Sequence, residues 1–263
     1  MREATRPPCP EGRGLLKDKI VVITAAAGAG IGGATARRCL EEGAGVLVSD
    51  AHERRLKETV AELADAHGRD AVAGRPCDVT DERQVQALYA AAVDRFGRID
   101  VAVNNAGLGG TADLADMTDE QWNRVLDVTL GGTFRCTRAV LRLLREQEGG
   151  GVIVNNASVV GWRAQRGQSH YAAAKAGVMA LTRCAALEAA AYGVRINAVA
   201  PSLAMHPHLV KVTTPELLES LTAAEAYGRH AEPWEVANVI VFLACDYSSY
   251  MTGEVVSVSG QHP

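Results

Sequence analysis

Short apolar runs alternate with longer amphipathic stretches along almost the whole chain, and this pattern constrains the fold more than any other feature of the sequence. The short runs are apolar at consecutive positions, which is typical of strands buried on both faces. The stretches between them carry apolar residues at helical spacing. Strands of this kind, separated by helices, predict an α/β fold with a parallel sheet covered on both sides. Right-handed crossovers then give a doubly wound sheet.

The expected elements follow one another with short connections. Strands are expected at 20–24, 46–50, 71–77, 99–104, 152–156, 194–199 and 254–258. Helices are expected at 31–42, 52–67, 81–96, 119–148, 169–192 and 233–245. The longest of these helices contains Gly131-Gly132, which predicts an irregular middle.

A single domain is expected, because the sequence shows no internal repeat and no low-complexity linker. Residues 1–15 contain prolines and arginines and predict a flexible N-terminal tail, while residues 16–263 predict the domain itself. One irregular segment, 202–230, lies late in this domain. A segment of that length is more often a binding element than a plain connection, so we expect it to form a lid over a site.

Composition narrows the class of partner. The net charge of −4, with 48% hydrophobic and 22% charged residues, gives no reason to expect nucleic acid or an anionic membrane. No apolar run reaches the roughly 18 residues of a membrane span, and the N-terminus carries no apolar signal segment. The six cysteines are scattered without a C-x-x-C pair or a Cys/His cluster. This pattern predicts buried free thiols in a reducing cytoplasm and no bound metal.

A glycine-rich turn follows the first expected strand and leads into a helix. Glycines let a backbone approach a pyrophosphate closely, and the helix N-terminus presents N–H groups to it. The same turn could also serve only to pack the helix on the strand. The residues expected to contact a cofactor here are Thr24, Ala26, Gly28, Gly30, Ile31 and Gly32.

Two acidic positions strengthen the cofactor hypothesis. Asp50 ends the second expected strand, where a carboxylate can accept hydrogen bonds from ribose hydroxyls and repel a 2′-phosphate. This favours NAD over NADP. Asp78, followed by Val79, comes after the third expected strand and could bind an adenine amino group. Asp78 could equally belong to the N-terminal turn of the next helix.

The candidate reacting centre combines a serine, a tyrosine and a lysine. Tyr171 and Lys175 are four residues apart, so they share one face of a helix. A nearby ammonium favours the phenolate, so we expect Lys175 to lower the tyrosine pKa from about 10 and make Tyr171 a usable base. Ser158 follows the fifth expected strand and could orient a substrate oxygen. The Tyr-x-x-x-Lys spacing alone arises often by chance, and the serine makes it specific.

These residues together resemble the short-chain dehydrogenase/reductase family, from about Leu16 to Gly260. The resemblance also covers the run from Asn104 to Gly107 and the run from Arg195 to Pro201. It implies a single Rossmann-like domain, a nicotinamide cofactor, usually a homotetramer, and hydride transfer with Tyr171 as acid and base. Further cofactor contacts implied by the resemblance are Asn105, Ala106, Gly107, Tyr171, Lys175, Pro201 and Ser202.

The chain departs from the family pattern at several places. Ala25 stands where the family turn begins with glycine. Thr129 stands at the fourth catalytic position, where the family has an asparagine that supports a proton-relay water beside the lysine. The threonine that binds the carboxamide in the family is missing after Pro201, and Ser202 or His206 is expected to substitute for it.

These departures resemble a narrower group, the bacterial dehydrogenases of late sterol catabolism. That resemblance implies oxidation of a ring hydroxyl on a hydrindane (C/D-ring) coenzyme A thioester, so the expected partner is a small-molecule acyl-CoA. Arg163 and His206 could meet phosphates or a carboxylate of such a substrate. They could also be solvated basic residues or part of the packing of the lid.

Two other functions stay open. Reduction of 3-oxoacyl thioesters uses the same chemistry, although Asp50 speaks against the NADPH that biosynthetic reductases usually take. A NAD-binding sensor or scaffold without turnover is suggested by Thr129 and the altered lid motif. The intact Ser158, Tyr171 and Lys175 favour an enzyme over this last function.

Overall fold

The computed structural model describes residues 7–206, 209–210 and 213–260, and its central feature is a parallel sheet. Within these residues the sheet has seven strands in the order β3-β2-β1-β4-β5-β6-β7, and every neighbouring pair is parallel. The strands are β1 (Ile20–Ile23), β2 (Gly45–Asp50), β3 (Val72–Pro76), β4 (Val101–Asn104), β5 (Gly151–Asn156), β6 (Val194–Pro201) and β7 (Val255–Val258). The doubly wound parallel sheet predicted from the sequence is confirmed.

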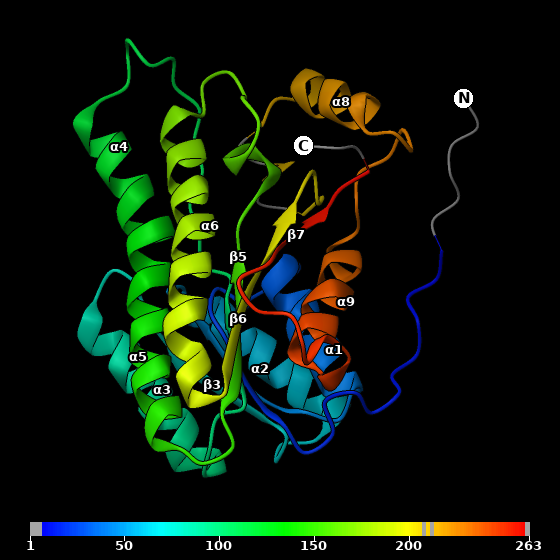
Figure 1. Ribbon diagram of the computed structural model, residues 1–263. Helices are drawn as coiled ribbons and strands as arrows, with labels where there is room; N and C mark the ends of the chain where they lie inside the picture. Colours follow the sequence, from blue (N-terminus) through cyan, green and yellow to red (C-terminus); the bar gives the residue numbers. More distant parts are fainter. Residues whose placement is uncertain (1–6, 207–208, 211–212, 261–263) are drawn as a thin grey trace.

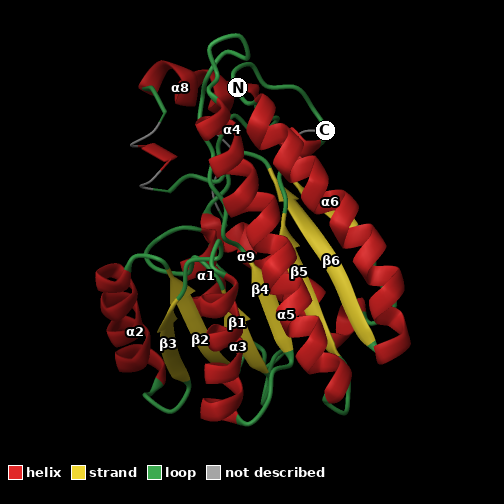
Figure 2. Cartoon of the chain, turned by 90° about the vertical axis from the view of Figure 1, so that its left-hand side faces the viewer, coloured by secondary structure: helices red, strands yellow, loops and turns green. Residues whose placement is uncertain are grey.

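Helices cover both faces of the sheet, as Figures 1 and 2 show. One face packs against α1 (Ile31–Glu41), α2 (Glu53–His67) and α9 (Pro233–Ala244). The other face packs against α3 (Glu82–Phe96), α5 (Gly132–Glu146) and α6 (Ser169–Ala189). Residues from β1, β2, β4 and β5 alternate between the two clusters; Val21 joins the first, for example, and Val22 the second. This alternation explains why the strands are apolar at consecutive positions.

The helix expected at 119–148 is interrupted near its middle. It consists of α4 (Asp119–Leu126), a π-helical turn (Asp127–Gly131) and α5. The interruption therefore ends at Gly131, the first residue of the Gly131-Gly132 pair that predicted it. A Cβ at Gly132 would press on the side chain of Val79, so this glycine lets α5 approach the segment after β3 closely.

The segment expected to form a lid contains regular structure. The helix α8 (Pro215–Ala224) begins with Thr214, whose hydroxyl caps it, and with a proline in the first turn. Figure 1 shows α8 beyond the carboxyl ends of the strands, towards which the arrows of β6 and β7 point. A parallel bridge between Ala204 and Ala231 brings the two ends of the segment together. The role of this segment as a lid stays a prediction.

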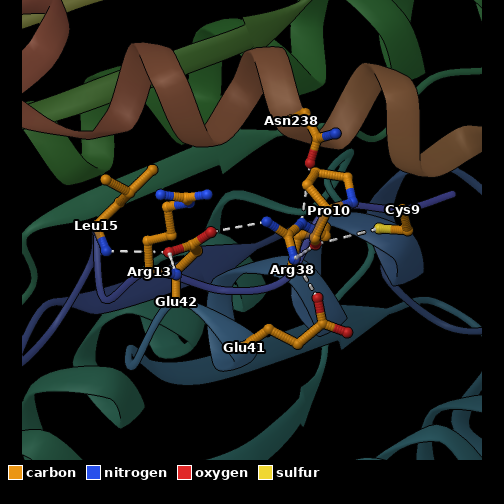
Figure 3. Close-up of polar contacts among 8 residues, drawn as sticks. All are labelled: Cys9, Pro10, Arg13, Leu15, Arg38, Glu41, Glu42 and Asn238. Carbon is orange, nitrogen blue, oxygen red and sulfur yellow. Dashed lines mark hydrogen bonds and ion pairs between the residues drawn. The ribbon is translucent and has the colours of Figure 1, made fainter. Parts of the chain in front are cut away.

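The N-terminal segment, expected to be a flexible tail, contacts the domain from Pro10 onward (Figure 3). The buried guanidinium of Arg38 on α1 donates to the carbonyl of Pro10 at 3.0 Å and pairs with Glu42 at 2.7 Å. The other oxygen of the Glu42 carboxylate accepts hydrogen bonds from the backbone N–H groups of Arg13 and Leu15. A buried ion pair therefore holds this segment in place. Residues 1–6 of the expected tail lie outside the described residues.

Across the described residues, no helix is long and apolar enough to cross a membrane. In the same part of the chain all six cysteines are free thiols, four of them buried.

Candidate active site

The residues singled out from the sequence gather at the carboxyl edge of the sheet. The glycine-rich turn follows β1, and Asp50 ends β2. Asn105 follows β4 and Ser158 follows β5. The strand order changes direction between β1 and β4, and doubly wound sheets bind ligands in the crevice at such a point.

The outer side of the glycine-rich turn is accessible to a ligand. Gly28 has a φ of +89°, and a Cβ added at Gly28 or Gly30 would meet no atom within 4 Å. Gly30 precedes the first turn of α1, which has no side-chain cap and no acidic residue. The N–H groups and partial positive charge of this helix end suit an anion such as a pyrophosphate.

The inner side of the turn packs tightly on the sheet. A Cβ at Gly32 would overlap the carbonyl oxygen of Ala25, and a Cβ at Gly33 would overlap that of Gly28. Ala25 itself has a φ of +51°, which costs a residue with a Cβ about 1 kcal/mol. The backbone at Ala25 therefore keeps a conformation that favours glycine, although the family's glycine is replaced.

The Thr24 hydroxyl joins the end of β1 to the segment after β4. It accepts hydrogen bonds from the backbone N–H groups of Asn105 at 3.0 Å and Ala106 at 3.1 Å. The Asn105 side chain in turn donates to the carbonyls of Thr24 at 3.2 Å and Ala25 at 3.0 Å. Thr24, Asn105 and Ala106, predicted as cofactor contacts, thus fix the shape of the turn. Ala26 is buried beneath it, and Ile31 packs against the core.

The Asp50 carboxylate is almost buried and holds several groups. It accepts hydrogen bonds from the backbone N–H groups of His52 at 2.9 Å and Ala27 at 3.3 Å. The guanidinium of Arg55 lies 3.6 Å away. Asp50 therefore anchors the glycine-rich turn to β2, a role that the sequence did not indicate. A carboxylate in this place also opposes a 2′-phosphate.

Asp78 lies in a turn before α3. One oxygen of its carboxylate accepts from the backbone N–H of Thr80 at 2.9 Å and from the Thr80 hydroxyl at 2.8 Å. The N–H of Asp78 donates to the Gln84 side chain at 3.0 Å. These contacts are the local turn that was the alternative interpretation of Asp78. Val79 is buried against Gly132, and a cofactor role for either residue stays a prediction.

Ser158 and Tyr171, the serine and tyrosine of the predicted reacting centre, lie close together. Ser158 precedes a short 3₁₀ turn after β5, and Tyr171 lies in the first turn of α6. Burial raises the pKa of Tyr171 to about 12, and a hydrogen bond with the Ser158 hydroxyl lowers it only in part. The expected lowering of this pKa by Lys175 is therefore wrong for this structure, because desolvation of the phenolate dominates. Tyr171 is a phenol at neutral pH and can donate a proton.

Lys175 lies beneath this pair and is 3% exposed. Its Nζ donates to the backbone carbonyl of Asn156 at 2.6 Å and lies 5.5 Å from the centre of the Tyr171 ring. Burial lowers the pKa of Lys175 to about 8. The ammonium form still prevails at pH 7. Gly107 permits the approach of the lysine, since a Cβ at this position would lie 3.3 Å from Nζ.

Thr129 lies in the π-helical turn and is completely buried. Its hydroxyl donates to the carbonyl of Leu108 at 3.1 Å and accepts from the N–H of Leu108 at 3.0 Å. Its carbonyl accepts from the Thr133 hydroxyl at 2.7 Å. Thr129 is close to the lysine, because a Cβ at Gly107 would lie near both side chains. Its hydroxyl, however, holds the loop after β4.

The end of β6 also reaches the site. The carbonyl of Pro201 accepts from the Ser158 hydroxyl at 3.5 Å, and the N–H of Ser202 donates to Val258 at 3.1 Å. Arg163 and His206 lie on the two segments that flank the site. Arg163 donates its backbone N–H to Val159, and His206 accepts from the N–H of Leu209. These contacts are local, and a substrate role for Arg163 or His206 stays a prediction.

Two buried polar residues at the site were missed by the sequence analysis. His170 is buried against Gly110, and its Nδ1 accepts from the N–H of Tyr171 at 2.9 Å. Asn156 holds Lys175 through its carbonyl. The consecutive asparagines Asn155-Asn156 were the available signal for it. In a strand buried on both faces, two adjacent polar residues place one amide on each side of the sheet.

The residues that the structure describes contain no group of three or more histidine, cysteine, aspartate or glutamate side chains placed to hold a metal ion.

The sequence and the fold of this chain are both similar to those of known proteins. A family model described as enoyl-(acyl carrier protein) reductase matches residues 25–260. A crystal structure of a short-chain dehydrogenase from Mycobacterium smegmatis superimposes with a TM-score of 0.88 at 59% sequence identity. That match covers 98% of this chain and 99% of the other.

Two relatives show which reactions occur among similar chains. The first is a (5R,7aS)-5-hydroxy-7a-methyl-1-oxo-2,3,5,6,7,7a-hexahydro-1H-indene-carboxyl-CoA reductase of Mycobacterium tuberculosis. It is 66% identical over 252 residues, which cover 96% of each chain. The second is a 3-oxoacyl-[acyl-carrier-protein] reductase of Thermotoga maritima, 41% identical over 93% of this chain and 98% of the relative.

Proposed function

The chain belongs to the short-chain dehydrogenase/reductase family of oxidoreductases, and from this premise we propose that it is an NAD-dependent dehydrogenase acting on a ring hydroxyl of a bicyclic acyl-CoA thioester. The observation that carries the proposal is the convergence of Ser158, Tyr171 and buried Lys175 beside the glycine-rich turn. A serine hydroxyl hydrogen-bonded to a phenol and an ammonium 5.5 Å from the centre of the phenol ring are groups suited to proton transfer to or from a substrate oxygen.

A nicotinamide cofactor of the NAD(P) type is general in the family, and the turn fits its pyrophosphate. The glycines leave room where a Cβ would project, and the uncapped end of α1 provides N–H donors. NAD rather than NADP is our proposal, supported by the carboxylate of Asp50 at the end of β2.

In the proposed reaction the substrate exchanges a hydride with the cofactor and a proton with Tyr171. A nicotinamide cofactor held by the glycine-rich turn would supply the hydride exchange with the carbinol carbon of the substrate. In the reductive direction the Tyr171 phenol would donate its proton to the substrate oxygen, and in the oxidative direction the phenolate, a minor form at neutral pH, would accept the hydroxyl proton. Ser158 would orient the substrate oxygen by hydrogen bonding. The charge of the Lys175 ammonium favours the phenolate in principle, although burial keeps Tyr171 mainly a phenol at neutral pH.

Similarity supports the bicyclic substrate over a straight-chain one. The mycobacterial relative, whose name specifies a hydroxylated bicyclic CoA thioester, is 66% identical, against 41% for the 3-oxoacyl reductase. Both of these names describe thioesters, so a thioester substrate is common to the two. Arg163 and His206 are proposed to contact the substrate from the segments that flank the reacting pair.

The decisive experiment is a substrate panel with the purified protein. It would compare hydroxylated bicyclic CoA thioesters with straight-chain 3-hydroxyacyl thioesters, each with NAD and with NADP. We expect the highest kcat/KM with a bicyclic thioester and NAD. Activity confined to straight-chain substrates with NADP would instead support a 3-oxoacyl reductase.

Tyr171→Phe provides the matched test of the chemistry. Loss of the hydroxyl should lower turnover by a factor of about 10³ or more while NAD affinity changes little, because the ring remains and only proton transfer is lost. NAD binding without turnover in the unchanged protein, on every substrate of the panel, would favour a sensor or scaffold.

We also propose a homotetramer in the cytoplasm. Exposed apolar side chains on the outer helices support an assembly: Phe134 on α5 is 43% exposed, and Leu187 on α6 is 81% exposed. The free thiols are typical of a reducing compartment. Light scattering during size-exclusion chromatography would measure the mass of the assembly.

A further inference from the structure

Lys175 is positioned by a residue that the sequence motifs did not include. Its Nζ donates to the carbonyl of Asn156 at 2.6 Å, whereas the Thr129 hydroxyl is bonded to Leu108. Asn156 is the last residue of β5 and is 8% exposed. It therefore lies at the junction of the sheet edge and the reacting pair.

The side chain of Asn156 reaches towards the nucleotide turn. Its Nδ2 donates to Oδ1 of Asn105 at 2.8 Å. The Asn105 amide nitrogen donates to the carbonyls of Thr24 and Ala25 in the turn. Asn156 thus contacts the lysine through its backbone and the glycine-rich turn through its side chain.

These bonds fix the orientation of both amides. Carbonyl oxygens can only accept, so the group of Asn105 that faces Thr24 and Ala25 must be its nitrogen. Its oxygen then faces Asn156 and needs a donor there. Turning the Asn156 amide would place two oxygens against each other, so Nδ2 has to point at Asn105 and Oδ1 away from it.

Oδ1 of Asn156 is buried and has no hydrogen-bond partner. A buried carbonyl oxygen without a donor is unfavourable, and such groups in folded proteins usually mark a place where a ligand or water completes the bonding. The free acceptor lies on a residue that connects Lys175 with the turn. If a dinucleotide bound by that turn placed its reactive ring beside Tyr171, the ribose next to the nicotinamide would lie between the turn and Lys175. That ribose carries hydroxyl donors.

We propose that Asn156 is a cofactor-binding residue whose Oδ1 accepts a hydrogen bond from the nicotinamide riboside half of the dinucleotide. The inference rests on the proposed nicotinamide-dependent function. It adds a residue that selects for the complete dinucleotide, because the adenosine half lies on the other side of the turn, near Asp50.

The test measures binding rather than turnover, with NAD and ADP as probes in isothermal titration calorimetry. Asn156→Val keeps the backbone carbonyl that holds Lys175 and keeps a strand-compatible side chain, but it removes Oδ1. We expect the Kd for NAD to rise about tenfold, the value of one hydrogen bond, while the Kd for ADP changes less than twofold. Asn156→Thr serves as a second variant with the same expectation if the valine variant does not fold.

Asn155→Val is the matched control. Asn155 is equally buried, but it bonds to Thr182 and Asn104 on the opposite face of the sheet. This variant should lose stability and leave both Kd values within twofold of the unchanged protein.

Two results would overturn the inference. One is an unchanged Kd for NAD in both Asn156 variants. The other is an equal rise for NAD and ADP, which would mean that Asn156 acts only by shaping the turn. Failure of the proposed function is recognised separately, because the unchanged protein would then bind neither NAD nor NADP.

Discussion

Burial acts in opposite directions on the two titrating residues of the site. It raises the pKa of Tyr171 to about 12 and lowers that of Lys175 to about 8, because in each case it disfavours the charged form. Burial thus shifts both side chains towards their neutral forms at the place where proton transfer is proposed. A buried ammonium without a carboxylate partner is unfavourable for folding, as is expected of a residue with the proposed catalytic role.

Lys175→Met should therefore be inactive and more stable. The folded-state pKa of Lys175 lies below the ordinary lysine value of 10.5, so the unfolded chain binds more protons between about pH 8 and pH 10.5. Stability of the unchanged protein must rise with pH across that window. We expect the methionine variant to be more stable by about 2 kcal/mol at pH 7, less at pH 10. Urea unfolding at both pH values measures this, and equal stability differences at the two would contradict the argument.

At the scale of elements, two local structures connect the sheet with the site. The glycine-rich turn is fixed from three directions, by Asn105, by Asp50 and by Thr59, whose hydroxyl accepts from the N–H of Gly28 at 3.0 Å. On the far side of α1, the Arg38–Glu42 pair ties the N-terminal segment to the helix, and Arg38 also donates to Asn238 on α9 at 2.9 Å. Both structures use polar side chains within a largely apolar layer.

Ala25→Gly should stabilise the turn. Ala25 has a φ of +51°, where glycine avoids a cost of about 1 kcal/mol but loses more conformational entropy on folding. The net gain should be about 0.5 kcal/mol, measured by urea unfolding. Ala25→Val is the opposite change and should destabilise by more than about 1 kcal/mol, since a β-branched residue is disfavoured at this φ. A stabilising valine would show that the turn is not strained there.

Arg38→Met should loosen the N-terminal segment. It leaves the buried Glu42 carboxylate without its guanidinium partner, and breaking such a pair costs about 3 kcal/mol. Arg37→Met is the matched control, because Arg37 pairs with Glu62 at the surface and its loss should cost less than about 0.5 kcal/mol. Limited proteolysis should cleave the Arg38 variant before residue 15 faster than the control.

The Glu42 carboxylate adds a dependence on pH to this cluster. Burial raises its pKa, but the hydrogen bonds from Leu15 and Arg13 and the charge of Arg38 together hold the pKa below the ordinary glutamate value of 4.5. The stabilisation is therefore complete above about pH 4.5 and is lost as pH falls through the lower folded-state value. The N-terminal segment should therefore be released below that pH, and the same proteolysis should cleave it faster there than at neutral pH.

At the scale of the whole molecule, the sheet brings distant segments to one edge. Thr24, Asn105, Asn156 and Ser202 come from four strand ends, and only the strand order β1-β4-β5-β6 makes them neighbours. The helices α1, α9, α3, α5 and α6 bury the apolar faces of the sheet, and α8 lies beyond the carboxyl ends of the strands (Figure 1). A ligand bound at this edge would therefore contact segments that are far apart in the sequence.

A dinucleotide should for that reason stabilise the entire fold. NAD at 100 times its Kd adds about 2.7 kcal/mol to the free energy of unfolding. For a chain of this size that corresponds to a rise in Tm of about 5–10 °C. NADP at the same concentration should give a smaller rise, because the Asp50 carboxylate opposes a 2′-phosphate. Differential scanning fluorimetry compares the two directly, and a larger shift with NADP would reverse the proposed preference.

Features that depend on the order of residues within a short stretch of chain could be predicted from the sequence alone. Consecutive apolar residues predicted the strands to within one or two residues at most ends, and Gly131-Gly132 marked the interruption before α5. The glycine-rich turn and the Tyr171–Lys175 spacing were visible because each lies within a few residues of chain. The sequence also placed Asp50 and Ser158 at strand ends, and the parallel order then required them to share an edge.

Features that depend on desolvation and on contacts between distant segments could be seen only in the tertiary structure. The pKa of Tyr171 rises instead of falling because its hydroxyl is buried, which no spacing reveals. Asn156 becomes the partner of Lys175 because β5 and α6 pack together, and its free Oδ1 follows from the bonds of Asn105. Pattern shows which residues share an element, whereas burial and pairing across elements set the charge and hydrogen bonding on which the site depends.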